Sequence, residues 1–487
     1  MHSALSDKLA RPWAPLAVFA GSVAVLRLPS FVGQLFDPDE AAVSAQGIGL
    51  WRGGEMYIDG IDRKPPLAPF IYEWSHRLTG DTDLRPLHVL VGLLLLGAVV
   101  VVAAEARRDG GRVAMWWGGA LMLTGALAMV PVDAQAANYG HFALPFGAVA
   151  MVAARRGTDR AALVAGLALA IATLTRQTWA IGVFPAAIAI HRYGNWRRHL
   201  PIAFVGGVLP ILVVAAAVRW DDFYYWTFIS NGSFVLGGAQ LSSIVVRGLS
   251  AALLFGALHF VAVRFALAGG RDSIERDLDL WVWVATGLIA VAAGFRFYGH
   301  YWLQVVPPLA LLAASELRTR ADEVQRRARN IVGITAIAAF ALAWAPGLVR
   351  SLPDPKPLAN AVAELTDEDD TVLIWGNFPE VYWTAERAPA AGFVSMDFVT
   401  GRSGARENGP QTIRDAPNRG YPHLLASIET EPPALIIDTQ PSELRGYGDY
   451  PIALFPELEA FIRENYDAPI VVDGFDVYRL SSPDPDG

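Results

Sequence analysis

Two charged motifs lie near the start of the chain, each beside a long apolar stretch. The first is residues 37–40, Asp-Pro-Asp-Glu, and the second is residues 63–66, Arg-Lys-Pro-Pro. A positioned carboxylate can act as a general base. Lys binds phosphate as a point charge and Arg binds it as a fork. The pair of motifs therefore predicts a site that removes a proton from one group and binds the phosphate of another.

The acidic motif stands where an apolar stretch ends and an amphipathic pattern begins, which is typical of a helix start. Asp37 is expected to be the N-cap, Pro38 the first helical residue and Glu40 the third, in a capping box. This interpretation leaves Asp39 without a capping role, at a helix N-terminus that favours its ionised form. We therefore predict Asp39 as the general base.

The basic motif places two cations and two prolines just before another apolar stretch. One interpretation is an interfacial anchor, in which Arg63 and Lys64 extend toward lipid headgroups. The cations are predicted on the outer side of the membrane, against the usual trend of positive charge inside, and a bound phosphate would account for them there. Both interpretations stay open on these residues alone.

Membrane-spanning helices are the elements that must position these motifs. The chain has 487 residues, of which 53% are apolar. Apolar stretches of about 18 residues or more are typical of spanning helices. The long candidates are 14–35, 86–104, 113–131, 200–218, 250–268 and 329–349, and the shorter ones are 138–154, 161–175, 177–191, 279–294 and 301–315. The chain has no cysteine and a net charge of −8, which excludes disulfides, thiolate metal sites and a basic nucleic-acid-binding protein.

Arginine clusters predict the orientation of these helices. They fall at 107–112, 155–160, 192–198, 264–276 and 318–329, and the positive-inside rule assigns all of them to the cytoplasm. About eleven helices satisfy this assignment, with a cytoplasmic N-terminus and the first helix retained instead of being cleaved as a signal. The stretch 161–191 must then cross twice, broken near Arg176. An ionisable group at that depth is either functional or paired with an outer carboxylate.

A third charged segment, residues 296–301, lies at a predicted outer helix mouth. Arg296, His300 and Tyr301 stand there among aromatic residues. They fit a phosphate site and an aromatic belt at the membrane interface equally well.

The chain is expected to divide into a membrane domain, residues 1–352 with an outer loop at 37–85, and a soluble extracytoplasmic domain, residues 353–487. A proline-rich linker begins the tail. Short strand-like runs follow at 372–375, 434–437, 470–472 and 475–478, and the last two predict a hairpin. Their alternation with helical segments predicts a small α/β domain.

In combination, these residues resemble the GT-C superfamily of membrane glycosyltransferases, and within it the protein O-mannosyltransferases and aminoarabinose transferases. The resemblance rests on Asp39 and Glu40 directly after the first helix, on residues 64–67 (Lys-Pro-Pro-Leu), and on residues 296–307. It covers residues 14–349 in architecture. The tail lacks the β-trefoil modules of eukaryotic O-mannosyltransferases.

The resemblance implies an inverting glycosyltransferase, a hexosyl- or pentosyltransferase, in a bacterial inner membrane. Its donor would be a sugar on a polyprenyl phosphate. Its acceptor would be an envelope glycan, lipid or protein at the outer face. No cofactor is required, and a divalent metal is compatible but not implied. The sugar, the acceptor, the role of the tail and the oligomeric state stay open.

The resemblance also implies roles for individual residues. Asp39 would deprotonate the acceptor hydroxyl, Asp37 could share or take this role, and Glu40 would orient an arginine or the acceptor. Lys64, helped by Arg63 or Arg296, would stabilise the departing phosphate. The remaining candidates for binding the donor phosphate are His300, Tyr301 and Arg176.

Two other functions are weighed against the transferase. A transporter or flippase of lipid-linked precursors would need a polar path to both faces, and many such folds show internal repeats, none of which is visible here. A non-catalytic scaffold would use the tail as a binding module and would not need Asp39 or Lys64.

Overall fold

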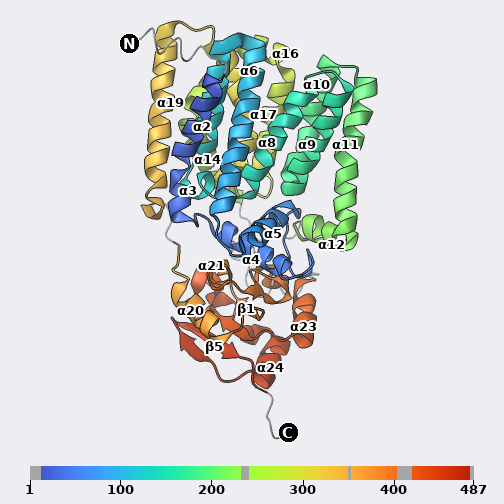
Figure 1. The fold of residues 1–487 in the computed structure, drawn as a ribbon, viewed down its shortest axis with the longest axis vertical. Helices are drawn as coiled ribbons and strands as arrows, with labels where there is room; N and C mark the ends of the chain where they lie inside the picture. The colour runs from blue at the N-terminus through green and yellow to red at the C-terminus, as the bar shows by residue number, and fades with distance from the viewer. Residues whose placement is uncertain (1–12, 232–240, 349–351, 403–418, 483–487) are drawn as a thin grey trace. The chain divides into compact units, whose positions relative to one another are not determined.

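The computed structural model describes residues 13–231, 241–348, 352–402 and 419–482 (Figure 1). The chain forms two compact units. The first, here called the helical unit, comprises Met1–Phe36, Leu84–Val214 and Leu241–Ser351. The second, here called the loop–tail unit, comprises Asp37–Asp83, Ala215–Gln240 and Leu352–Gly487.

The helical unit contains only helices among its described residues. In chain order they are α2 (Ala14–Leu26), α3 (Leu28–Gly33), α6 (Arg85–Leu127), α7 (Pro131–Ala134), α8 (Tyr139–Ala154), α9 (Asp159–Thr175), η1 (Gln177–Gly182), α10 (Val183–Tyr193), α11 (Trp196–Ala217), α14 (Leu241–Leu258), α15 (Phe260–Ala268), α16 (Gly270–Arg276), α17 (Leu278–Ala292), η3 (Gly299–Gln304), α18 (Val306–Leu317), α19 (Asp322–Ala343) and η4 (Pro346–Leu348).

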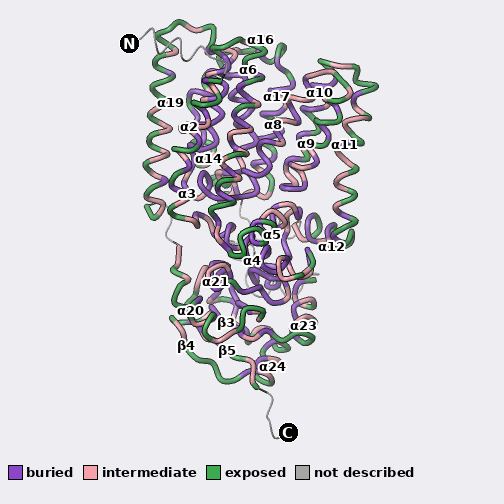
Figure 2. The backbone as a smooth tube through the Cα atoms, viewed as in Figure 1, coloured by how far each residue is buried: buried purple, intermediate pink, exposed green. Residues whose placement is uncertain are grey.

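Three of the described helices, α6, α11 and α14, are long and apolar enough to cross a membrane. Figure 2 shows buried residues concentrated on α8, whereas α11 and α19 are mostly exposed or intermediate. Large apolar side chains are exposed on α11 and α14, including Phe204 and Leu253. A water-soluble protein rarely exposes so much apolar surface, so these faces fit contact with lipid. The number of spans stays a prediction.

Two predicted helix breaks are confirmed by the backbone. Gly111 has φ 72° and ψ −161° inside α6, which separates the predicted stretches 86–104 and 113–131. Arg176 is extended, with φ −152° and ψ 115°, between α9 and η1. The first break uses the freedom of glycine at positive φ.

A buried ionic network ties four helices of this unit together. The Arg155 guanidinium on the α8 end lies 2.9 Å from Glu105 and 3.0 Å from Asp109, both on α6. It also lies 3.0 Å from Asp279 on α17 and donates to the Tyr193 hydroxyl on α10 at 3.0 Å. Removing one partner of such a buried network leaves an uncompensated charge, so loss of any one of these side chains is expected to destabilise the packing of the helices.

The loop–tail unit is mixed α/β. Its helices are α4 (Pro38–Trp51), α5 (Leu67–Thr79), α12 (Trp220–Tyr224), η2 (Tyr225–Ile229), α20 (Lys356–Leu365), α21 (Pro379–Ala385), η5 (Ala390–Gly392), α22 (Asp397–Thr400), α23 (Gly420–Thr430), η7 (Gln440–Ser442), η8 (Leu444–Asp449), η9 (Ile452–Leu454) and α24 (Pro456–Asn465). Its strands are β1 (Thr371–Trp375), β2 (Ala388–Pro389), β3 (Leu435–Asp438), β4 (Ile470–Val472) and β5 (Phe475–Arg479).

The five strands form one sheet in the order β2-β1-β3-β5-β4. β1 pairs in parallel with β2 and β3, whereas β5 pairs antiparallel with β3 and β4. The hairpin turn between β4 and β5 has positive φ at Asp473 (52°) and Gly474 (83°), the geometry that two-residue hairpins favour. The tail is therefore α/β, and its predicted hairpin is present.

The first loop shares a hydrophobic core with the tail. Leu50, Met56, Tyr57 and Ile61 belong to the same buried cluster as tail residues such as Trp375. The sequence prediction assigned residues 37–85 to the membrane domain and placed its single boundary after residue 352. The contacts instead group 37–83 and 215–240 with the tail. The physical reason is that the apolar residues of the loop are buried against the tail.

Candidate active site

The acidic motif forms the capping box that its sequence predicts. Asp37 is the N-cap of α4, with φ −133° and ψ 137°, and Pro38 occupies the first helical position. The Asp37 carboxylate accepts from the backbone N–H of Asp39 at 2.9 Å. The Glu40 carboxylate in turn accepts from the backbone N–H of Asp37 at 3.2 Å. Asp37 and Glu40 therefore cap the N-terminus of α4, and the Glu40 side chain is buried.

Asp39 instead lies against the basic motif. Its Oδ2 is 3.4 Å from Nζ of Lys64. The side chains are 48% exposed for Asp39 and 33% exposed for Lys64. A solvent-exposed ion pair of this kind contributes about 0–1 kcal/mol to stability. Stability alone therefore accounts poorly for a carboxylate and an ammonium held together at a helix N-terminus.

Helix α5 packs against α4 beside the acidic motif. Burial raises the pKa of Tyr72, and the carboxylates of Glu40, Asp39 and Asp37 raise it further, which places the phenol beside the motif. A Cβ added at Gly47 of α4 would lie 3.0 Å from Cβ of Tyr72 and 3.0 Å from the backbone N of Glu73. Glycine thus allows α4 and α5 to approach closely.

His76 of α5 contacts α4 through one ring nitrogen and the loop after α5 through the other. Its Nδ1 lies 3.1 Å from the Asp81 carbonyl, and its Nε2 lies 3.1 Å from Oγ of Ser44. The carbonyl can only accept, so Nδ1 carries the hydrogen and Nε2 accepts from the Ser44 hydroxyl. Burial lowers the pKa of His76 to about 4. Sequence reasoning missed Tyr72 and His76, although their spacing of four residues on one helix face was a usable signal.

We expect His76 to make the stability of the protein depend on pH. Its folded pKa lies below the unfolded value of about 6.5, so its contribution is complete above pH 6.5 and is lost as the pH falls toward 4. The loss would reach the order of 3 kcal/mol. Thermal unfolding of the full chain between pH 7.5 and 4 would measure it.

The matched variant is His76→Gln, which cannot be protonated. It should be less stable at pH 7.5 and should show a flatter decline between pH 6.5 and 4. Parallel curves for the two proteins would contradict a neutral, buried His76.

The backbone of the basic motif is held from two sides. The Tyr57 hydroxyl donates to the Lys64 carbonyl at 3.0 Å, and Nδ2 of Asn231 donates to the Arg63 carbonyl at 2.6 Å. The Arg63 guanidinium lies 4.1 Å from the centroid of the Phe398 ring and donates to the Asp397 carbonyl at 3.1 Å. Arg63 therefore binds the tail, while Lys64 binds Asp39. A role for Arg63 on the donor phosphate stays a prediction.

Three of the remaining candidates come together in the helical unit. The Tyr301 ring lies 3.8 Å from the guanidinium carbon of Arg176 and 4.9 Å from the His300 ring. Nδ1 of His300 is 2.6 Å from Oδ1 of Asp133, whose carboxylate also accepts from the backbone N–H groups of Gly299 and His300. Arg296 is buried in the same unit. Their predicted roles in binding the donor phosphate stay predictions.

Arg27 and His88 form a buried polar pair that the sequence reasoning missed. Nη1 of Arg27 donates to the Ala134 carbonyl at 2.9 Å, and Nη2 lies 3.3 Å from Nδ1 of His88. Nε2 of His88 lies 2.7 Å from the Gln34 carbonyl. An arginine inside the apolar stretch 14–35 was the signal for this pair.

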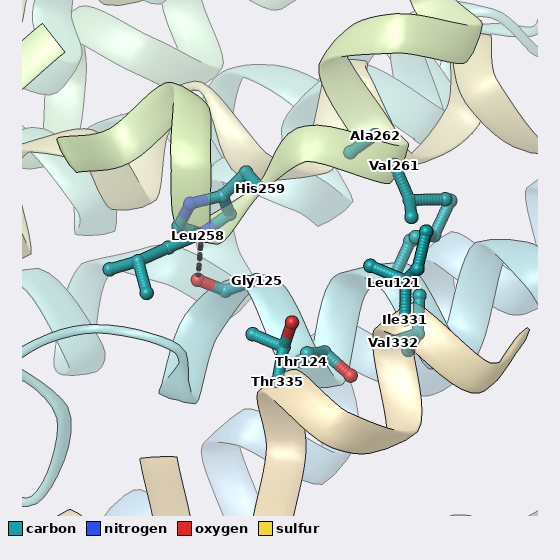
Figure 3. A pocket seen from close by; sticks show the side chains of 10 residues that line it. All are labelled: Leu121, Thr124, Gly125, Leu258, His259, Val261, Ala262, Ile331, Val332 and Thr335. Atoms are coloured by element: carbon teal, nitrogen blue, oxygen red, sulfur yellow. Dashed lines mark hydrogen bonds between the residues drawn. The ribbon is translucent and has the colours of Figure 1, made fainter. Parts of the chain in front are cut away.

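A small cavity lies elsewhere in the helical unit (Figure 3). It has a volume of only about 20 Å³ and is lined mainly by apolar side chains of α6, α14, α15 and α19, together with His259. None of the predicted site residues lines it. Within the described residues, no group of three or more His, Cys, Asp or Glu side chains is placed to hold a metal ion.

Comparison with known proteins gives matches in structure only. No protein-family model and no curated protein matches the sequence. Apo ArnT from Cupriavidus metallidurans superposes with a TM-score of 0.62 at 14% identity, covering 96% of this chain and 99% of ArnT. ArnT bound to undecaprenyl phosphate gives a TM-score of 0.60 at 13% identity, covering 97% and 100%. The chain therefore shares its fold with ArnT.

An archaeal protein matches as well. The oligosaccharyltransferase AglB from Archaeoglobus fulgidus, in complex with an inhibitory peptide and a dolichol-phosphate, gives a TM-score of 0.55 at 12% identity. That match covers 97% of this chain and 75% of AglB. The shared fold therefore extends over nearly the whole chain, and the predicted resemblance to GT-C enzymes is confirmed at the level of the fold.

Proposed function

We propose that this chain is a glycosyltransferase that uses a polyprenyl-phosphate sugar as donor. The observation that carries the proposal is the contact between Asp39 and Lys64 at the N-terminus of α4, beside a capping box that accounts for the neighbouring acids. The GT-C fold supports it. So do the structural neighbours, which were solved with undecaprenyl phosphate and with dolichol-phosphate.

The proposed reaction is an inverting displacement. Asp39 takes the proton of an acceptor hydroxyl, and the resulting oxygen nucleophile bonds to the anomeric carbon from the face opposite the phosphate. The bond between the anomeric carbon and the phosphate oxygen breaks, and its electron pair leaves with the polyprenyl phosphate. Lys64 stabilises the negative charge that grows on this leaving group. Binding of the donor would draw Lys64 from Asp39 to the phosphate and leave the carboxylate to act as a base.

The wider proposal follows the predicted topology. The site would face the outer side of a bacterial inner membrane, and the acceptor would be an envelope glycan, lipid or protein that takes a hexose or pentose. By the same resemblance, Arg296, His300, Tyr301 and Arg176 of the helical unit are proposed to bind phosphate. Neither a cofactor nor a metal enters the proposed steps.

Donor turnover in a defined bilayer tests the function. The purified full chain would be placed in liposomes with polyprenyl-phosphate hexose or pentose and a panel of envelope acceptors. Free polyprenyl phosphate and a new glycoside should appear together, in equal amounts. Movement of the intact donor between leaflets, without release of polyprenyl phosphate with any acceptor, would instead support a flippase.

A further inference from the structure

A row of large apolar side chains runs along one face of α12 and η2. Trp220 and Tyr224 are each 50% exposed, Phe228 is 52% exposed and Ile229 is 50% exposed. The two central members are neighbours, because the rings of Tyr224 and Phe228 lie 5.9 Å apart between centroids. These four residues are called the aromatic stripe below.

The opposite face of the same segment is packed into the loop–tail unit. Phe223 meets the Tyr57 ring edge-on at 6.1 Å between centroids, and Trp226 meets Phe398 at 6.1 Å. The Thr227 hydroxyl lies 3.2 Å from the Tyr57 hydroxyl. This face of the segment is therefore buried in the core of the unit, whereas the aromatic stripe is exposed on its surface.

Chain connectivity places the stripe at a membrane boundary. It begins at Trp220, three residues after α11 ends at Ala217, and α11 is long and apolar enough to cross a membrane. Residues that directly follow a span lie at the level of the lipid headgroups, where Trp and Tyr are enriched because one end of each ring system is apolar and the other polar. Arg219 lies at the same level, with a side chain that is 62% exposed and an ion pair to Asp222 at 3.2 Å.

We propose that the aromatic stripe is an interfacial anchor, seated in the headgroup region of the leaflet in which α11 ends. The partner is the lipid surface itself. The anchor has a consequence for the candidate site, because the segment that carries it also holds the basic motif. Tyr57 links Thr227 to the Lys64 carbonyl, and Asn231 donates to the Arg63 carbonyl. The stripe thus fixes the loop that carries Lys64 at a set depth relative to the headgroups.

Site-directed spin labelling tests this anchor without any measurement of turnover. The chain has no cysteine, so each introduced cysteine gives a single labelling site. Tyr224→Cys, Phe228→Cys and Ile229→Cys would be labelled in the full chain, in nanodiscs of phosphatidylethanolamine and phosphatidylglycerol. The matched control is Val471→Cys on β4, an apolar residue of the same unit that is 71% exposed.

Power saturation with oxygen and with a water-soluble nickel chelate would report the depth of each label. Labels in the stripe should show a ratio of oxygen to nickel accessibility several-fold above that of the control. Ratios equal to that of Val471→Cys would overturn the proposal. So would spin–spin coupling between labels of two chains, because a second copy would then cover the stripe. Unfolding midpoints equal to that of the parent chain establish that each labelled variant is folded.

Discussion

Replacing Asp39 by asparagine is expected to lower kcat by about 10²- to 10⁴-fold, the usual contribution of a positioned general base. Asparagine keeps the size and polarity of the side chain but cannot take a proton. The expected loss falls on kcat, because Asp39 acts on the acceptor proton in the transition state. Single-turnover measurement of glycoside formation, with the donor in excess of its KM, would show this directly.

Asp37→Asn is the matched control, two residues away in the same turn. The role of Asp37 in the structure is to accept a hydrogen bond as the N-cap of α4, and asparagine caps helices as well as aspartate does. We expect this variant to keep close to parental kcat and stability. If Asp37→Asn loses activity while Asp39→Asn retains it, Asp37 is the base and the role proposed for Asp39 is wrong.

The start of α4 shows why the different roles of Asp37 and Asp39 could be predicted from the sequence alone. The capping box and the hairpin across residues 473–474 are set by residues within a few positions of one another. Local sequence rules predicted the capping box and the hairpin, whereas the break at Arg176 was predicted from the topology that the arginine clusters require, and the structure contains all three. The contact between Asp39 and Lys64, which are 25 positions apart, agrees with the prediction that the two motifs serve one site.

The partners of Arg63 could not be predicted from the sequence. Asp397 follows Arg63 by 334 positions, and no local pattern connects them. The same holds for Asn231, which holds the Arg63 carbonyl, and for the shared core of the loop and the tail. These contacts depend on which apolar faces meet when the whole chain collapses. The sequence shows that such faces exist, but it does not show which one covers which.

Lys64→Met is expected to lower kcat by about 10²- to 10³-fold, as when a single preorganised donor to a developing anion is removed. Methionine keeps the aliphatic length of the side chain and removes only the charge. The matched control is Lys356→Met, at an exposed position of α20, which should leave kcat unchanged. Steady-state rates across a range of pH would be compared for the three proteins.

The pH profile separates two explanations of the contact between Asp39 and Lys64. If Lys64 only kept the neighbouring carboxylate ionised, the Lys64→Met variant would regain parental kcat on the alkaline side. If Lys64 stabilises the leaving phosphate, the deficit persists at every pH, because the missing charge is needed in the transition state itself. A double variant with Asp39→Asn then completes a mutant cycle. A combined loss close to the product of the two single losses would mean that base and phosphate ligand act independently, whereas a much smaller combined loss would mean that they act as one unit.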